Sequence, residues 1–163
     1  MRGLFLFAAG VLVGLTIQAA IAQSPNRGIV GLNHVGISVP NLDQAVAYYT
    51  KTLGFPEAFR NFDDKGKPTL VYVQMSKNTF LELQPASADR PPGISHFGVV
   101  VDKMTEATAM FKQRGANVSA IRTSGTKAIL SNVTDPNGVR MELLELPSES
   151  QHRLAMDRWK EPR

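Results

Sequence analysis

The fold is decided by two short stretches, His34-Val-Gly-Ile-Ser-Val39 and His96-Phe-Gly-Val-Val-Val101, which align with each other 62 residues apart. In both, apolar side chains occupy every second position, which is the pattern of a strand with one buried face. Each stretch begins with a histidine and has a glycine two residues later. A pattern that recurs at such an interval indicates an internal duplication.

The residues after the first stretch predict a helix and three strands. Asn41 is suited to cap a helix with Gln44 answering it, and apolar residues recur at helical spacing until Gly54, a natural stop. Short strands are then expected near residues 56–62, 69–76 and 79–84.

The second half repeats this order. A strand near residues 94–101 is followed by Asp102 as a helix cap, a helix to about Arg114, and strands near 117–122, 126–133 and 139–145. The halves also end alike, in Phe80-Leu-Glu-Leu83 and Arg140-Met-Glu-Leu143. The sequence therefore predicts an α+β fold built from two βαβββ modules.

A glutamate lies in the middle of each module's last apolar strand, Glu82 in one and Glu142 in the other. Alternation places each carboxylate on the face opposite its apolar neighbours. A lone strand glutamate is usually solvated on an outer face. If that face is interior, the carboxylate must be paired or bound to a cation, because burying it alone costs several kcal/mol.

Two of the three histidines occupy matching positions in the two modules, as the two glutamates do. A lone strand histidine is more often a hydrogen-bonded structural residue, but a pseudo-twofold axis relating the modules brings all four side chains together. We therefore predict one divalent metal ion held by His34, Glu82, His96 and Glu142. Two imidazoles and two carboxylates suit Zn, Ni, Co, Mn or Fe(II), and the absence of cysteine excludes thiolate ligands.

The chain of 163 residues suits a single domain, with different segments at its two ends. Residues 1–22 have a basic start, an apolar run and a small-residue cleavage pattern, which predicts a secretory signal peptide and a periplasmic or secreted protein. An uncleaved membrane anchor is the alternative, since the apolar run is only slightly shorter than a membrane span.

Residues 23–27 are then a polar linker, and residues 28–146 form the domain, with module 1 at 28–84 and module 2 at 94–146. Residues 84–95, rich in Pro and Ala, are expected to act as the hinge between the modules. The tail at 147–163 is expected to form a short helix that docks on the domain or on a second subunit.

The partners expected from composition are small molecules. The formal net charge is +4, but Lys and Arg are scattered along the chain, so nucleic-acid binding is not expected. No membrane contact is expected after signal cleavage. His152 in the tail matches no repeat position and receives no functional role. A role in shaping the pocket is open for the residues Phe59, Arg60, Tyr72 and Phe97, but ordinary core or surface packing is the favoured interpretation.

From Gly28 to Pro147 the sequence resembles the vicinal-oxygen-chelate superfamily, which includes glyoxalases, bleomycin-resistance proteins and ring-cleaving dioxygenases. The resemblance lies in Leu32-Asn-His-Val-Gly-Ile-Ser-Val39, Tyr48-Tyr-Thr-Lys-Thr-Leu-Gly54, Leu81-Glu-Leu83, Ser95-His96 and Asp135-Pro-Asn-Gly-Val-Arg-Met-Glu-Leu143. It implies curled half-barrel sheets around a central metal cleft, with ligands at His34, Glu82, His96 and Glu142. In some members one chain forms the site and in others two subunits share it, which leaves a homodimer open.

The resemblance implies a metal-dependent lyase or isomerase of glyoxalase type, in which a substrate chelates the metal through neighbouring oxygens while Glu142 or Glu82 moves a proton. The glutathione hemithioacetal is not the expected substrate. Ser38 and Ala86 stand where glyoxalase I carries the Arg and Asn that bind glutathione. The alternatives are an Fe(II) ring-cleaving enzyme, which would use His34, His96 and Glu142 as its ligands, and a non-catalytic protein that binds a drug or metabolite.

Overall fold

The computed structural model describes residues 28–160. The predicted signal peptide at 1–22 and the polar linker at 23–27 lie outside the described residues. Within residues 28–160, none of the helices has the length and apolar character needed to cross a membrane.

Both halves of the chain begin with a strand and a helix and then add further strands, three in the first half and four in the second. The first half consists of β1 (Ile29–Val39), α2 (Leu42–Ala47), the π-helical turn η1 (Tyr48–Thr52), β2 (Glu57–Phe62), β3 (Pro68–Ser76) and β4 (Thr79–Pro85). The second half consists of β5 (Gly93–Val101), α3 (Met104–Gln113), β6 (Asn117–Val118), β7 (Arg122–Thr123), β8 (Ile129–Thr134) and β9 (Arg140–Glu145). Helix α4 (Gln151–Arg158) follows them in the tail.

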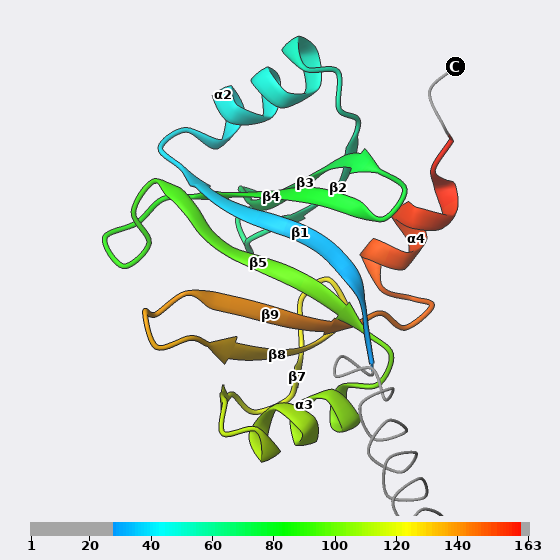
Figure 1. The fold of residues 1–163 in the computed structure, drawn as a ribbon. Helices are drawn as coiled ribbons and strands as arrows, with labels where there is room; N and C mark the ends of the chain where they lie inside the picture. The colour runs from blue at the N-terminus through cyan, green and yellow to red at the C-terminus, as the bar shows by residue number, and fades with distance from the viewer. Residues whose placement is uncertain (1–27, 161–163) are drawn as a thin grey trace, which may run out of the picture.

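The strands form one open, mixed sheet of nine strands in the order β2-β3-β4-β1-β5-β9-β8-β6, with β7 paired to β8. Each half contributes one side of this sheet, and the two sides meet where β1 pairs antiparallel with β5 (Figure 1). Within each half the first and last strands are parallel neighbours, β1 with β4 and β5 with β9. The predicted α+β fold of two βαβββ modules is confirmed.

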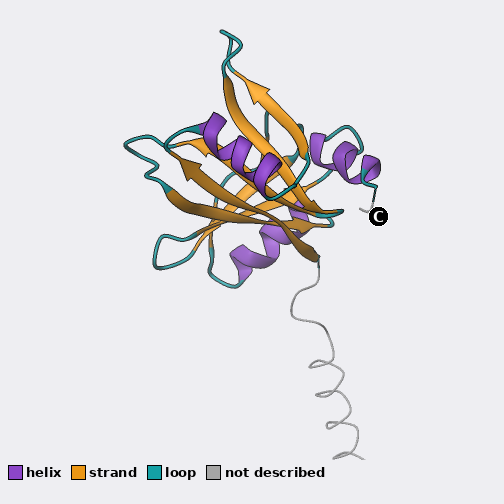
Figure 2. Ribbon diagram, turned by 90° about the horizontal axis from the view of Figure 1, so that it is seen from above, coloured by secondary structure: helices purple, strands orange, loops and turns teal. Residues whose placement is uncertain are grey.

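The hydrophobic core is divided between the two modules, because each module packs its own helix against the apolar face of its strands. Leu81 and Leu83 of β4 belong to a cluster that includes side chains of α2. Leu143 of β9 packs in a second cluster with Met104 and Ala107 of α3. Figure 2 shows the helices outside the strand layer. The opposite face of β4 and β9 carries Glu82 and Glu142 together with apolar side chains such as Phe80 and Leu144.

Several predicted boundaries differ from the structure. Asn41 caps α2 as expected, since its side chain accepts a hydrogen bond from the Gln44 amide at 3.0 Å, but the α-helical part ends at Ala47 and continues as a π-helical turn. The prediction that Asp102 caps the second helix is wrong. Lys103 occupies the N-cap position, and Glu145 accepts the Met104 N–H at 2.6 Å instead.

The strand predicted at 117–122 is divided into β6 and β7, and the strand predicted from 126 begins only at Ile129. A tight turn explains the delay, because the Lys127 amide donates to the Ser124 carbonyl at 3.0 Å and Lys127 has a φ of 61°. This turn lies beside the site described next.

Candidate metal centre

The two histidines face each other across the pair of central strands. In the antiparallel register of β1 and β5, His34 lies opposite Gly98 and His96 lies opposite Gly36. A Cβ atom built on Gly36 would lie 2.1 Å from Cε1 of His96, and one built on Gly98 would lie 2.2 Å from Cε1 of His34. Each imidazole therefore lies over a glycine of the other module, and a larger residue at either glycine would overlap the ring.

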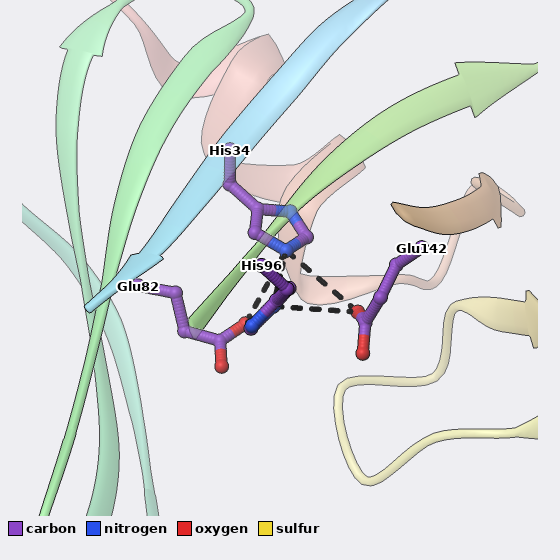
Figure 3. A group of neighbouring side chains, drawn as sticks. All are labelled: His34, Glu82, His96 and Glu142. Atoms are coloured by element: carbon purple, nitrogen blue, oxygen red, sulfur yellow. Dashed lines mark hydrogen bonds and ion pairs between the residues drawn. The ribbon is translucent and has the colours of Figure 1, made fainter. Parts of the chain in front are cut away.

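The same two glycines align the glutamates. Glu82 on β4 is the register partner of Gly36 on β1, and Glu142 on β9 is the register partner of Gly98 on β5. Each row across the sheet thus consists of a glutamate, a glycine and the histidine of the other module. Because all four side chains leave the sheet on one face, they converge (Figure 3).

The four side chains are buried and close together. The Nε2 atoms of His34 and His96 are 3.0 Å apart. Oε2 of Glu82 lies 3.5 Å from Nε2 of His34 and 3.6 Å from Nε2 of His96. Oε2 of Glu142 lies 3.7 Å and 3.8 Å from the same two nitrogens. One donor atom from each residue is within 4.8 Å of all the others, so residues of a single chain make up the whole cluster.

Neighbouring polar groups orient the two imidazoles. Nδ1 of His34 lies 2.9 Å from Oδ1 of Asn33, an acceptor, so Nδ1 carries the proton and Nε2 is free to bind a metal ion. Nδ1 of His96 lies 2.9 Å from Oγ of Ser95, whose hydroxyl donates to the Gly36 carbonyl at 3.2 Å. Ser95 can therefore accept a proton from His96, which leaves Nε2 of His96 free as well.

The two carboxylates have different partners. The buried hydroxyl of Tyr72 donates to Oε2 of Glu82, whereas Oε1 of Glu142 accepts from Nη1 of Arg140 at 3.0 Å. Arg140 also has its Nη2 2.9 Å from Nδ1 of His96. Glu82 is thus held by a neutral group, and Glu142 by a cation.

Their acidities differ accordingly. Burial alone would raise the pKa of Glu82, but the hydrogen bond with His96 and electrostatic interactions with His34 and His96 lower that pKa to about 2. Burial raises the pKa of Glu142 above its usual range, and the opposing effects of His96 and Arg140 do not cancel this rise. Burial lowers the pKa of His34 to about 4, which keeps its imidazole neutral near pH 7.

This donor set fits a divalent metal ion. Two ligands bonded to one metal at about 2.1 Å and at right angles lie about 3 Å apart, which is the separation of the two Nε2 atoms here. The imidazole of His34 is neutral near pH 7, both carboxylates have oxygens directed at the same point, and the residues behind the ligands fix their orientation. His34, Glu82, His96 and Glu142 could together hold one ion.

Helix α4 brings a residue to the site that the sequence analysis left without a role. His152 is buried against the rings of Tyr72 and Phe59, with centroids 4.6 and 5.0 Å away, and lies 6.2 Å from the ring of His34. Neither of its ring nitrogens has a hydrogen-bond partner, and burial lowers its pKa to about 3. No position of the repeated sequence pattern corresponds to His152, so that pattern could not reveal it.

Of the residues that sequence analysis assigned to ordinary packing, some lie near the candidate site and others do not. Tyr72 reaches the candidate site, and Phe59 stacks on Tyr72 with centroids 4.6 Å apart. Arg60 instead forms an ion pair with Glu57. Phe97 packs against the hydrophobic cluster that includes residues of α3. Tyr72 on β3 is the register partner of Glu82 on β4. The sequence alone does not reveal this pairing, because it depends on how the two strands align.

Paired βαβββ modules with four converging histidine and glutamate side chains define the class of protein. The family comparison agrees: the model of the Glyoxalase/Bleomycin resistance protein/Dioxygenase superfamily matches residues 31–143. The chain belongs to this superfamily, and the predicted resemblance is confirmed.

Its relatives include two kinds of enzyme. It is 29% identical over 123 residues to a lactoylglutathione lyase of Salmonella typhimurium, covering 70% of this chain and 91% of the relative. It is 25% identical over 152 residues to a mitochondrial methylmalonyl-CoA epimerase of Bos taurus, covering 77% and 82%. The crystal structure of methylmalonyl-CoA epimerase from Mycobacterium tuberculosis has the same fold, with a TM-score of 0.66, 22% identity and coverage of 79% and 97%.

Proposed function

We propose that this protein is a metal-dependent lyase or isomerase that moves a proton on a small substrate chelated through two neighbouring oxygens. The observation that carries the proposal is the convergence of one donor atom from each of His34, Glu82, His96 and Glu142 within 4.8 Å. The lyases and epimerases among its relatives support this type of chemistry.

A divalent ion held by these four residues would act as a Lewis acid that acidifies the carbon next to a chelated carbonyl. The chain's own residues supply the proton transfer. A carboxylate accepts the proton from that carbon and returns it to the adjacent atom, so that the group is regenerated in each turnover. Burial of the cluster limits competing reactions with water.

Glu142 is the better candidate for this base. Tyr72 holds the oxygen of Glu82 that lies nearest the histidines, and the low pKa of Glu82 makes it a weak base. The raised pKa of Glu142 brings its carboxylate closer to the pH at which a general base works well. Glu82 then serves mainly to hold the ion.

Export is part of the proposal. The pattern of residues 1–22 supports action in the periplasm or outside the cell. Amino-terminal sequencing of protein recovered from the periplasm of the producing cells tests this. We expect a mature chain that begins near Gln23, whereas retention of Met1 in the cytoplasm would contradict export.

The proposed reaction is tested by solvent deuterium exchange. Protein loaded with Ni, Co, Zn or Mn is incubated in D₂O with a panel of α-hydroxycarbonyl compounds, and deuterium at the α-carbon is measured. We expect exchange with the loaded wild type and none with Glu142→Ala. No exchange into any compound by protein that contains metal would contradict the proposed function. Oxygen uptake with Fe(II) and catechols would favour the ring-cleaving alternative instead.

A further inference from the structure

A cleft of about 390 Å³ opens beside the candidate metal ligands, and its walls are mainly polar. Glu82 and Glu142 form part of its surface, and both modules contribute the remaining residues. Only Leu70, Leu130 and Tyr72 bring large apolar or aromatic side chains to it. The cleft is therefore suited to a compact polar ligand in contact with the metal site.

The charged residues of the cleft are three arginines and two glutamates, without lysine or aspartate. Arg140 is paired with Glu142, and Glu82 lies against the two histidines. Arg90 and Arg122 remain without a carboxylate partner among the described residues. The cleft thus has an excess of positive charge, and a bound divalent ion would increase it.

Arg90 lies in the link between the modules, and Arg122 lies on the short strand β7 of module 2. Nη2 of Arg90 donates to the Pro85 carbonyl at 2.8 Å, while the buried Nε of Arg90 has no partner. Arg122 on β7 is exposed and makes no hydrogen bond or ion pair within residues 28–160, although its charge acts on Glu142. Both guanidinium groups retain donors for a ligand.

Hydroxyl groups and a close approach of the two modules define one wall. In the turn before β8, the Oγ of Ser124 and the Oγ1 of Thr126 are 2.8 Å apart. A Cβ on Gly125 of this turn would lie 3.3 Å from Nδ2 of Asn61 on β2. The turn is anchored to α4, because the Gln151 amide donates to the Thr126 carbonyl at 2.9 Å. The cleft is bounded by fixed elements.

Arg140 links the cleft to metal binding. A guanidinium can only donate hydrogen bonds, so its contact with Nδ1 of His96 requires the imidazole proton to be on Nε2. A metal ion at Nε2 of His96 requires the proton on Nδ1, where Ser95 accepts it. With a metal ion on Nε2 of His96, the contact between Arg140 and His96 could not form, and Nη2 of Arg140 would be available to a ligand in the cleft.

We propose that this cleft binds a carboxylate group of the substrate through Arg90, Arg122 and Arg140. The substrate is then a small anion that offers neighbouring oxygens to the metal and a further carboxylate to the arginines. Arginine suits this role because its planar donors bind a carboxylate in bidentate fashion. The inference rests on the proposed function for the chelating end of the molecule, but the arginine subsite is a property of the cleft itself.

Calorimetric titration tests the subsite in two arms. Metal-free protein is titrated with succinate and with its neutral diamide, which examines the arginines alone. Zinc-loaded protein is titrated with malate and with lactate, which share an α-hydroxycarboxylate but differ in the second carboxylate. We expect succinate to bind and the diamide not to bind, and malate to bind zinc-loaded protein at least 10-fold more tightly than lactate.

Arg90→Gln and Arg122→Gln are the matched variants, and Lys112→Gln on the exposed face of α3 is the control, since it removes the same charge away from the cleft. Both arginine variants should lower succinate affinity and reduce the malate preference at least 5-fold, with melting temperature and zinc content unchanged. Lys112→Gln should change neither affinity. Equal affinities for succinate and its diamide, or the same loss in Lys112→Gln, would overturn the subsite. Loss of the proposed function would instead appear as absent zinc in protein that still binds succinate.

Discussion

Modules 1 and 2 place the same residues at the same positions but surround them differently. In both, a histidine on the first strand lies over a glycine of the other module, and a glutamate on the last strand is the neighbour of that module's own glycine. In module 1 a tyrosine holds the glutamate, and in module 2 an arginine does. The symmetry of the backbone thus brings the four side chains together, and under the proposed function the asymmetry of their neighbours would separate holding an ion from moving a proton.

The largest effect is expected from the two glycines on which the symmetry depends. Gly36→Ala and Gly98→Ala would each place a Cβ within about 2.2 Å of an imidazole, so the ring must leave the site. We expect metal affinity to fall about 100-fold in either variant, the upper end of losses seen when ligand orientation is disturbed. Gly31→Ala, also on β1 but with nothing within 4 Å of the new Cβ, is the control. Equal zinc affinity in all three by calorimetry would contradict the cross-module packing.

Replacing each glutamate by neutral glutamine should have a different effect in the two modules. We expect Glu82→Gln to lose most bound metal, because this carboxylate is held in place as a ligand. Glu142→Gln should keep a substantial part of its metal and lose proton exchange by about 10²-fold or more, as expected when a general base is removed. Elemental analysis measures the bound metal and deuterium exchange measures proton transfer, both on the same samples. The reverse pattern would assign the base to module 1.

Replacing the residue that contacts each glutamate should change zinc affinity by a smaller amount, and in opposite directions for the two glutamates. Tyr72→Phe removes the hydrogen bond to Glu82 and should weaken zinc binding about 10-fold. Arg140→Gln removes a cation that contacts both Glu142 and His96, so zinc should bind several-fold more tightly. Changes of the same sign in both variants would show that the modules hold their glutamates in equivalent ways.

The smallest effect concerns His152, which belongs to neither module. Its pKa of about 3 in the folded protein is below the value near 6.5 of an unfolded chain. As pH falls from about 6.5 towards 3, the unfolded chain takes up a proton that the folded protein does not. His152 therefore lowers the free energy of unfolding by up to about 1.4 kcal/mol per pH unit in this range.

His152→Phe removes this contribution and retains an aromatic ring beside Tyr72 and Phe59. In denaturant unfolding at several pH values, the free energy of unfolding of this variant should fall less steeply below pH 6.5 than that of the wild type. The decline due to other groups, His34 among them, remains in both proteins. An unchanged slope would mean that His152 is protonated in the folded state.

Most of the fold and the four cluster residues could be predicted because the repeated sequence pattern shows each feature twice. His34 and His96 recur at equivalent strand positions, and alternation alone places Glu82 and Glu142 opposite the core. What the repeat does not contain could not be predicted. Tyr72 and Arg140 reach the cluster through strand register, and His152 through the docking of α4. Arg90 lies in a link that composition describes only as a hinge.

The two local errors have different origins. Asp102 is a good capping residue by type, but Glu145 from a distant strand reaches the helix start first. The strand expected from residue 126 is shortened by a turn that Ser124 closes, with its Oγ accepting the Ala128 amide at 3.1 Å. A contact from a distant strand overrides the local preference at Asp102, whereas turn contacts between near neighbours in the sequence delay the start of β8.

The central claim is that four residues of one chain form one metal site, and metal content per chain tests it directly. Elemental analysis is applied to the wild type, to His34→Ala with Glu82→Ala, to His96→Ala with Glu142→Ala, and to the two double variants refolded together. We predict one divalent ion per wild-type chain and none in either double variant or in their mixture. Wild-type metal content in a double variant, or metal regained on mixing as in a site shared between subunits, would contradict the claim.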